Sequence, residues 1–290
     1  MSLFTEQRTY IETLRKEYQK EKKWKDSLLE MIDIVELSES VYNSNAIENS
    51  TLSLSDTEKI LLDMKTAKNL HIREVYEARN LSKVIEYMRI KAKYDELSLD
   101  LILFIHEMLL TGINDEFAGR LRKPWEYVRI GSHIAPPPEE VERLLEEALV
   151  HSLAIDTIHP VEQISQFHLT FEHIHPFCDG NGRIGRVLLN FQLLSLGLPM
   201  VIIRFRDRPT YYESFREYDE RRNTKTFDNL LYLSLTESLH KRLAYLTGKK
   251  IIPLSEYARS IWESGSSLAN KAKRQTIRAF REKWVWKVRV

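Results

Sequence analysis

Apolar residues recur at spacings of three and four along most of this chain of 290 residues. This period matches the turn of an α-helix, so it predicts that the body of the protein is all-α. The predicted helices cover residues 10–29, 60–70, 74–88, 99–110, 141–153, 164–173, 185–196 and 230–246. With 43% hydrophobic and 29% charged residues, the chain has the composition of a soluble globular protein with a real core.

One stretch within this helical body, residues 125–135, carries an alternating pattern of β-favouring residues instead. The alternation surrounds Gly131, Ser132 and His133, which is the pattern of a short hairpin. Three prolines at 136–138 and two glutamates follow, and this order favours the start of the next helix. The sequence therefore predicts a small β-hairpin flap between two helices.

The C-terminal residues differ from the rest in charge. Residues 249–290 carry 11 Lys and Arg against 3 Asp and Glu, whereas the net charge of the whole chain is only +1. After a predicted linker at 248–253, the pattern indicates a helix at 254–262, a turn at 263–267, a basic helix at 268–274 and two short strands within 276–290. This order resembles a helix-turn-helix with a wing, so we expect a basic winged-helix-like module over residues 250–290.

The length predicts about two domains. We expect an N-terminal helical region over 1–95, a core over 96–247 that carries the flap, and the basic module. Cys178 is the one cysteine, which excludes an internal disulfide and makes the cytoplasm the expected location. Since no apolar run reaches 18 residues, neither membrane insertion nor secretion is expected.

The densest cluster of reactive groups is His175-Pro-Phe-Cys-Asp-Gly-Asn-Gly-Arg-Ile-Gly-Arg186. Gly180, Asn181 and Gly182 stand where this loop becomes a helix. At such a junction, backbone N–H groups and the helix dipole both favour an anion, because glycine lets the anion approach closely. Phosphate is the natural occupant, so we expect the chain to act on nucleotide phosphates.

The side chains around this turn fit the same ligand. Asp179 suits Mg²⁺, which takes one or two protein carboxylates and completes its shell with phosphate oxygens and water. Arg183 and Arg186 are three residues apart on one helix, so both can bind the same polyphosphate. His175 has a natural pKa near neutrality and is the expected general base.

Other residues near the cluster receive structural roles. His168 and His173, taken with His175, lack a cysteine or a third ligand at the spacing of a zinc site. We therefore expect His168 to pack inside the helical body, and Phe177 to insert into the core and fix the loop.

The stretch from His175 to Arg186 resembles the Fic family motif, His-Pro-Phe-x-Asp/Glu-Gly-Asn-Gly-Arg-x-x-Arg, at every specified position. The resemblance extends over roughly residues 40–220. It implies a helical Fic core that transfers AMP from ATP to a Ser, Thr or Tyr hydroxyl of a target protein. By this resemblance, His175 would deprotonate that hydroxyl and Asp179 would hold Mg²⁺. The backbone amides of residues 180–182 would bind the phosphates, and Asn181 would assist at the α-phosphate. Arg183 and Arg186 would bind the β- and γ-phosphates.

The resemblance also assigns roles to the flap and to the adenine end. The flap residues Ile130, Gly131, Ser132, His133 and Ile134 would align a target segment by strand addition. Tyr212 matches an aromatic residue beside adenine. Asp219 stands where the family has Asn, and an ionised carboxylate accepts hydrogen bonds but cannot donate them. The preference for adenine is therefore open.

A second match lies upstream, at Ser44-Asn-Ala-Ile-Glu48-Asn49. It resembles the Ser/Thr-x-x-x-Glu-Gly/Asn motif of an inhibitory helix found in one class of Fic proteins. Ser44 is expected as the N-cap of a helix over 44–49, with Glu48 one turn along. By this resemblance Glu48 pairs with Arg186, which withholds the guanidinium from the γ-phosphate.

Two alternative functions use the same sequence. In the first, Lys271, Lys273, Arg274 and Arg278 bind DNA phosphates and the core acts as a nucleotide sensor. In the second, the same site removes AMP from a modified protein, with Glu48 aligning a water molecule. The sequence leaves the target protein and the oligomeric state undetermined.

Overall fold

The computed structural model describes residues 3–64, 70–131, 133–153 and 159–290, and it is predominantly helical, as predicted. The predicted flap residue Ser132 lies outside these ranges. The chain forms two compact units. The first comprises Met1–Glu36, Pro199–Val201 and Asn229–Val290, and the second comprises Leu37–Leu198 and Ile202–Asp228.

The boundaries between the two units differ from the predicted domain boundaries near residues 95 and 247. Residues 250–290 belong to the same unit as the N-terminal helix, and several of their charged side chains pair with acids of that unit. The division into three functional parts stays a prediction.

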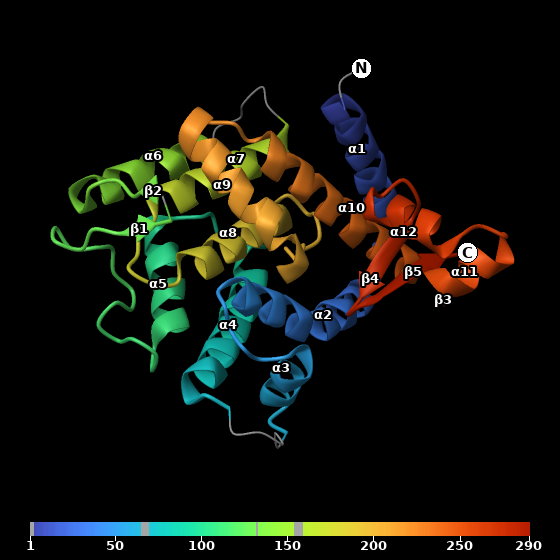
Figure 1. The fold of residues 1–290 in the computed structure, drawn as a ribbon, viewed down its shortest axis with the longest axis horizontal. Helices are drawn as coiled ribbons and strands as arrows, with labels where there is room; N and C mark the ends of the chain where they lie inside the picture. Colours follow the sequence, from blue (N-terminus) through green and yellow to red (C-terminus); the bar gives the residue numbers. More distant parts are fainter. Residues whose placement is uncertain (1–2, 65–69, 132, 154–158) are drawn as a thin grey trace. The chain divides into compact units, whose positions relative to one another are not determined.

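The second unit holds most of the predicted helices, and it contains the two-stranded flap (Figure 1). Its elements are the end of α2 (Asp26–Ile47), α3 (Leu54–Leu61), α4 (Ile72–Lys91), α5 (Leu99–Leu110), β1 (Arg129–Ile130), β2 (His133–Ile134), η1 (Pro138–Glu140), α6 (Val141–Leu153), α7 (Pro160–Ile174), α8 (Asn181–Ser195), η2 (Phe205–Asp207) and α9 (Arg208–Arg221). In Figure 1, α8 runs through the middle of this unit and packs against α4, α5 and α7.

Helix α8 is buried along its length because its apolar residues recur with the helical period. Ile184, Val187, Leu188 and Phe191 join one core cluster, and they fix the position of the α8 N-terminus. Phe177, in the loop before α8, inserts into the same cluster, as predicted. The loop between α7 and α8 is thus attached to a rigid element at both ends.

Two predicted helices in the N-terminal part were wrong in their bounds. The range 10–29 is divided into α1 (Leu3–Glu21) and α2, because none of the residues Glu21–Lys25 is buried and Trp24 adopts φ 65°. The predicted helix at 60–70 begins earlier, at Leu54, and ends at Leu61. A capping box explains the early start, since Ser53 and Asp56 each accept a hydrogen bond from the other's backbone N–H.

Helix α9 was not predicted. Its sequence is rich in charged residues, and its buried side chains are Tyr211, Ser214 and Tyr218. These positions keep the helical spacing of three and four, but two of them carry hydroxylated aromatics and one a serine. A search for aliphatic periodicity therefore misses this helix, although it forms one wall of the site described below.

The first unit contains α1, the beginning of α2, most of α10 (Lys225–Leu246) and the C-terminal elements. The latter are β3 (Ile251–Pro253), α11 (Leu254–Ser260), α12 (Gly265–Lys273), β4 (Ala279–Glu282) and β5 (Val285–Arg289). The strands form an antiparallel sheet in the order β3-β5-β4, with α11 packed against β5 and α12 against α11. The predicted helix-turn-helix and wing are present.

The predicted linker at 248–253 was partly wrong, because Ile251–Pro253 forms β3 and pairs with β5 from Arg289 to Lys287. Ile252 is buried in the small core of this module together with Val288. The apolar pair Ile251 and Ile252 therefore completes the sheet. A linker reading of Lys-Lys-Ile-Ile-Pro overlooks this burial.

Many basic side chains of residues 249–290 form ion pairs within their own unit. Arg278 and Arg289 both contact Glu17 of α1, and Arg281 contacts Glu237 of α10. Lys271 pairs with Glu263, and Lys287 pairs with Glu282. Two of the four residues predicted to bind DNA, Lys271 and Arg278, are therefore engaged by carboxylates, whereas Lys273 and Arg274 are exposed.

A buried charge cluster joins α10 to the beginning of α2 in the first unit. Arg242 is 1% exposed and donates to Asp33 and Glu36 at 2.7 Å each. Burial opposes the ionisation of Glu36, but Arg242 and Lys241 outweigh it and lower its pKa to about 2.

Among the helices in the described part of the chain, none has the length and apolar character needed to cross a membrane.

We predict that Arg242→Ala lowers the free energy of unfolding by about 3–5 kcal/mol, because it leaves two partly buried carboxylates without their cation. The control Arg143→Ala removes a surface pair whose arginine side chain is 58% exposed, and should cost less than about 1 kcal/mol. Urea unfolding followed by circular dichroism measures both. Equal losses in the two variants would contradict the structural role of the buried cluster.

Candidate active site

The loop between α7 and α8 has a backbone conformation that its own residues stabilise. His175 ends α7 in the left-handed region, at φ 50°, and Gly180 precedes α8 at φ 83°. Between them, the Asn181 side chain accepts a hydrogen bond from the Phe177 N–H at 2.9 Å and donates to the Phe177 carbonyl at 2.8 Å. Both ends of the Asn181 amide are therefore bound to the loop, which fixes the orientation of this side chain.

His106 of α5 also contacts this loop, and the sequence analysis did not identify it as a site residue. Its ring stacks on Phe177 with centroids 3.6 Å apart. Nδ1 accepts from the Gly119 N–H at 3.1 Å, so Nε2 carries the proton and donates to the Asp179 carbonyl at 3.0 Å. Burial lowers the pKa of His106 to about 4, which keeps the ring neutral in this role.

Arg122 holds the other side of the loop, although its side chain is only 4% exposed. Its guanidinium donates to the carbonyls of Ile174 and His175 on the loop side and to those of Glu126 and Pro136 next to the flap. One buried side chain thus connects the end of α7 with the flap segment. The geometry of His175 therefore depends on Arg122.

His175 presents one ring nitrogen to the pocket. Its Nδ1 lies 3.3 Å from the Glu172 carbonyl, which can only accept, so Nδ1 carries the proton and Nε2 carries the lone pair. Burial lowers the pKa of His175 to about 4. The ring is therefore neutral at physiological pH and can accept a proton at Nε2.

The predicted metal ligand Asp179 lies beside two cations. Its Oδ1 is 2.9 Å from Arg183 Nη2, and its Oδ2 is 2.9 Å from Arg73 Nη2 of α4. Arg183 also lies 3.4 Å from Glu77 of α4. Arg73 and Glu77 were missed by sequence reasoning because their signal is only an i, i+4 charge pair on a distant helix.

Arg186 is the most completely engaged side chain of the motif, and it is 5% exposed. Its Nε donates to Ser44 Oγ at 2.9 Å, and Nη1 donates to Tyr211 Oη at 3.3 Å. Nη2 donates to the Ser44 carbonyl and to Glu48 Oε1, both at 2.9 Å. The two residues that the sequence motifs place 138 positions apart are thus in contact.

A second carboxyl group next to Arg186 does not balance its charge. Glu172 is buried, and this burial raises its pKa to about 8, so the group is mainly protonated at neutral pH. Burial opposes the charge of Arg186, but Tyr211 and Glu48 raise its pKa, so the guanidinium stays charged. Glu48 is therefore the ionised partner that compensates this buried cation.

The upstream motif is positioned differently from the prediction. Ser44 was expected to begin a helix, but it lies in the last turn of α2, which ends at Ile47. The Glu48 N–H donates to the Asn45 carbonyl, so the helix tightens and the Ser44 carbonyl is available to Arg186. Asn49 follows at φ 69°, a conformation that Gly and Asn adopt most readily, which explains the residue choice in the motif.

The second unit contains a pocket of about 560 Å³ that some of these residues line. The sequence-predicted residues Glu48, His175, Gly182, Tyr212 and Asp219 line it, as do the flap residues Ile130, Gly131 and His133. Ile134 of the flap is 70% exposed.

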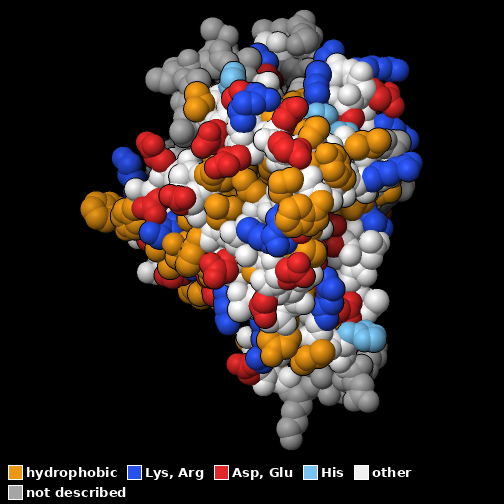
Figure 2. Space-filling model, turned by 90° about the vertical axis from the view of Figure 1, so that its left-hand side faces the viewer, with side chains coloured by type: hydrophobic (Ala, Val, Ile, Leu, Met, Phe, Trp, Pro, Cys, Tyr) orange, Lys and Arg blue, Asp and Glu red, His pale blue; other side chains and the backbone are white. Residues whose placement is uncertain are grey.

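On the face shown in Figure 2, hydrophobic side chains lie exposed among charged side chains of both signs.

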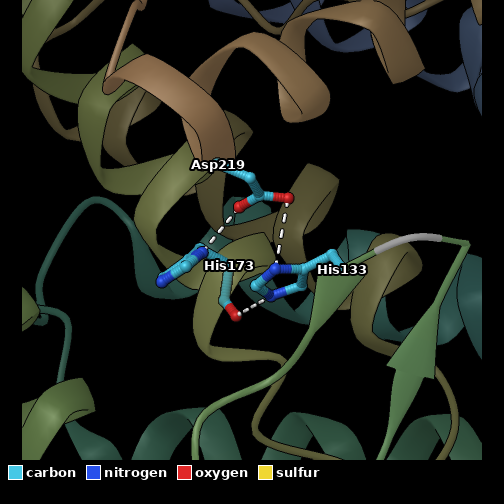
Figure 3. A group of neighbouring side chains, drawn as sticks. All are labelled: His133, His173 and Asp219. Carbon is cyan, nitrogen blue, oxygen red and sulfur yellow. Dashed lines mark hydrogen bonds and ion pairs between the residues drawn. The ribbon is translucent and has the colours of Figure 1, made fainter.

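Three polar residues meet at the wall of the pocket (Figure 3). Asp219 of α9 lies 2.6 Å from His173 Nδ1 at the end of α7, and 3.4 Å from His133 Nδ1 in β2. His133 Nε2 lies 2.9 Å from the His173 carbonyl. The predicted adenine-end residue Asp219 is thus engaged by two histidines that the sequence did not connect to it.

The fold and the site define a class of helical protein. Its loop and helix N-terminus place His175 and Gly182 at one pocket, beside Glu48 and the buried Arg186 that pairs with it. Residues 96–193 match the model of the Fic/DOC family. The chain therefore contains a Fic/DOC family domain.

Similar proteins carry the same domain. The chain is 36% identical over 177 residues to the protein adenylyltransferase Fic of Nematostella vectensis, which covers 60% of this chain and 41% of that protein. It is 34% identical over 179 residues to protein adenylyltransferase fic-1 of Caenorhabditis elegans, with coverages of 60% and 35%. The chain thus spans about two fifths or less of the length of these curated relatives.

Solved structures share the fold. A Fic domain containing signalling protein from Bacteroides thetaiotaomicron superposes with a TM-score of 0.75 at 24% identity, covering 83% of this chain and 97% of that one. A segment of Fic-1 from C. elegans gives a TM-score of 0.69 at 25% identity, covering 84% and 73%. The helical Fic fold predicted from the motif is confirmed.

We predict that Gly180→Ala destabilises the protein by about 1–2 kcal/mol, because Gly180 has φ 83° and an added Cβ would lie 3.1 Å from Leu109. Gly265→Ala is the matched control, since nothing lies within 4 Å of its added Cβ and its φ is negative. Thermal and urea unfolding measure the difference. If both variants had the same stability, the left-handed turn would not be a constraint on the loop.

Proposed function

We propose that this chain is a nucleotidyltransferase that transfers AMP from ATP to a Ser, Thr or Tyr hydroxyl of a target protein. The observation that carries the proposal is the buried guanidinium of Arg186, which needs an anionic partner inside the pocket that also contains the neutral His175. A phosphate group of a nucleotide supplies that anion. The names of the similar proteins, protein adenylyltransferases, support the same reaction.

In this proposal the phosphates lie at the N-terminus of α8. The backbone N–H groups of the first helical turn have no intrahelical acceptor, so Gly180, Asn181 and Gly182 donate to the phosphates. Arg183 and Arg186 bind the outer phosphates through forked hydrogen bonds. Gly182 also makes room for the contact between Glu48 and Arg186, because a Cβ at this position would collide with the Glu48 carboxylate and approach Arg186.

His175 acts as general base. Its Nε2 accepts the proton of the target hydroxyl, the hydroxyl oxygen forms a bond to the α-phosphorus, and the bond from that phosphorus to the bridging oxygen breaks. AMP becomes attached to the target and pyrophosphate leaves. The flap residues around Ile130 to Ile134 align the target segment, and Tyr212 lies beside the adenine.

Asp179 fits Mg²⁺ in its chemistry, since it offers a hard carboxylate oxygen and its side chain is 27% exposed. Arg73, whose side chain is 57% exposed, can withdraw from it at little cost. When bound, the ion would neutralise negative charge on the phosphates. Asp179 would hold it, and the Arg183 contact would keep that carboxylate oriented.

Glu48 keeps the site idle in this proposal, because it occupies the guanidinium that the γ-phosphate requires. The contact is a charge-assisted hydrogen bond at 2.9 Å to a buried cation. ATP must therefore displace Glu48 before it can bind productively. Removing AMP from a modified target stays the alternative use of the same residues.

We predict that Glu48→Gly raises AMP incorporation at least about tenfold, since a hydrogen bond to a charged group contributes about 1.5–3 kcal/mol. Incorporation of labelled AMP from ATP and Mg²⁺, with a cell lysate as the source of targets, measures the change. Glu86→Ala is the control, because Glu86 is exposed on α4 and does not line the pocket.

The inhibitory role of Glu48 would be wrong if wild type, Glu48→Gly and Glu86→Ala incorporated AMP equally. Release of AMP from a labelled target by the wild-type protein, without incorporation by any variant, would favour the alternative reaction.

We predict that His175→Ala in the Glu48→Gly background abolishes AMP transfer but keeps ATP binding, because Nε2 serves the chemical step only. The parent variant should keep a constant rate from pH 8 down to about pH 5, since the pKa of His175 is lowered to about 4 and the ring loses its base function only below that. ATP binding is measured by calorimetry and the rate by labelled AMP. Loss of ATP binding in His175→Ala would contradict the role of the base.

The remaining expectations keep the status of predictions. Binding of nucleic acid by residues 254–290 would rely on exposed residues such as Lys273 and Arg274, because several other cations of this module are ion-paired. A protein target with a hydroxyl side chain and a cytoplasmic location stand as sequence-based expectations.

A further inference from the structure

Three elements of the second unit bring a cluster of metal-binding side chains to the flap. His133 comes from β2, His173 from the end of α7 and Asp219 from α9 (Figure 3). One possible ligand atom from each residue lies within 4.8 Å of the others. The three side chains are largely buried, with exposures of 14%, 20% and 20%.

The hydrogen bonds of the cluster leave an electron-rich gap. His133 Nε2 lies 2.9 Å from the His173 carbonyl, which can only accept, so Nε2 carries the ring proton. In the neutral ring, the Nδ1 lone pair then faces the Asp219 carboxylate, 3.4 Å away. A lone pair and a carboxylate oxygen repel each other unless a proton or a metal cation lies between them.

We propose that this gap is a site for Zn²⁺, bound by His133 Nδ1, His173 Nδ1 and the Asp219 carboxylate. In tetrahedral zinc sites the metal lies about 2.0–2.2 Å from nitrogen and oxygen ligands, which places neighbouring ligand atoms about 3.3–3.5 Å apart. The observed separation of 3.4 Å between His133 Nδ1 and Asp219 has this value, whereas the 2.6 Å between His173 Nδ1 and Asp219 is a hydrogen bond that must lengthen to admit the ion. The donor set of two imidazoles and one carboxylate suits zinc and leaves one position open toward the pocket.

The second contact of His133 is the one that zinc ligands require. A metal-bound histidine usually donates its other ring N–H to a carbonyl or carboxylate, which fixes the tautomer and the ring orientation. His133 already makes this bond, to the His173 carbonyl. The ligand from the flap is therefore pre-oriented before the metal arrives.

His173 must change its tautomer to bind the ion. Arg222 donates to His173 Nε2 at 3.1 Å, so the proton is on Nδ1 and donates to Asp219. On binding zinc, Nδ1 gives up this proton and Nε2 takes one, which turns Nε2 from an acceptor into a donor. Arg222 must then move away, and its exposed position allows this. Arg222 thus competes with the metal through His173.

Zinc binding would attach the flap to α7 and α9, because the three ligands come from these three elements. It would also occupy the Asp219 carboxylate, at the end of the pocket where the adenine is expected to lie. The site does not depend on the proposed transfer reaction, because metal binding can be measured without nucleotide or target.

Titration of metal-free protein with ZnSO₄ by calorimetry tests the site. We expect one zinc per chain in the wild type, and binding at least about tenfold weaker in His133→Ala and in Asp219→Asn, because each loses a ligand. The control His151→Ala removes an exposed histidine of α6 outside the cluster and should bind as the wild type does. Circular dichroism verifies that each variant is folded.

Arg222→Ala gives a readout that a merely structural cluster would not give. It removes the donor that stabilises the metal-free tautomer of His173, so zinc should bind several-fold more tightly. The proposal is overturned if the wild type binds no zinc, or if His133→Ala binds as tightly as wild type, which would mean adventitious zinc elsewhere. Weaker binding to Arg222→Ala would exclude His173 as a ligand.

Discussion

The buried charge of Arg186 is the constraint on which the site depends. A guanidinium that is 5% exposed cannot rely on water, so the protein must provide an anion within hydrogen-bonding distance. Glu172 is adjacent but mainly protonated, and Glu48 supplies the charge instead. A nucleotide phosphate can replace Glu48 because it also brings an anion within hydrogen-bonding distance of Arg186. The Glu48–Arg186 ion pair is therefore both a structural contact and the proposed switch.

The loop between α7 and α8 is rigid because buried polar side chains bind its backbone. Asn181 closes the loop onto Phe177, His106 supports Asp179 from below, and Arg122 binds the carbonyls of Ile174 and His175. These contacts hold His175 in a left-handed conformation that a non-glycine residue adopts at a cost. The position of the proposed base is therefore set by residues that never touch a substrate.

Sequence reasoning located the helices of the second unit because their aliphatic residues keep a clear period, as in α5 and α6. It missed α9, whose buried face consists of tyrosines and a serine, and it misplaced Ser44, which a local motif suggests as a helix start. It also read the basic C-terminal residues as a possible surface for nucleic acid. Several of them instead pair with carboxylates such as Glu17 and Glu237, which are distant in sequence.

The sequence alone determined which groups lie at the N-terminus of α8, because residues 175–186 are contiguous and their order fixes this arrangement. It also indicated the pairing of Glu48 with Arg186, through a second short motif. Only the tertiary structure decided which groups surround them. The meeting of His133, His173 and Asp219 arises from three elements separated by tens of residues, and no spacing rule along a chain encodes such a contact.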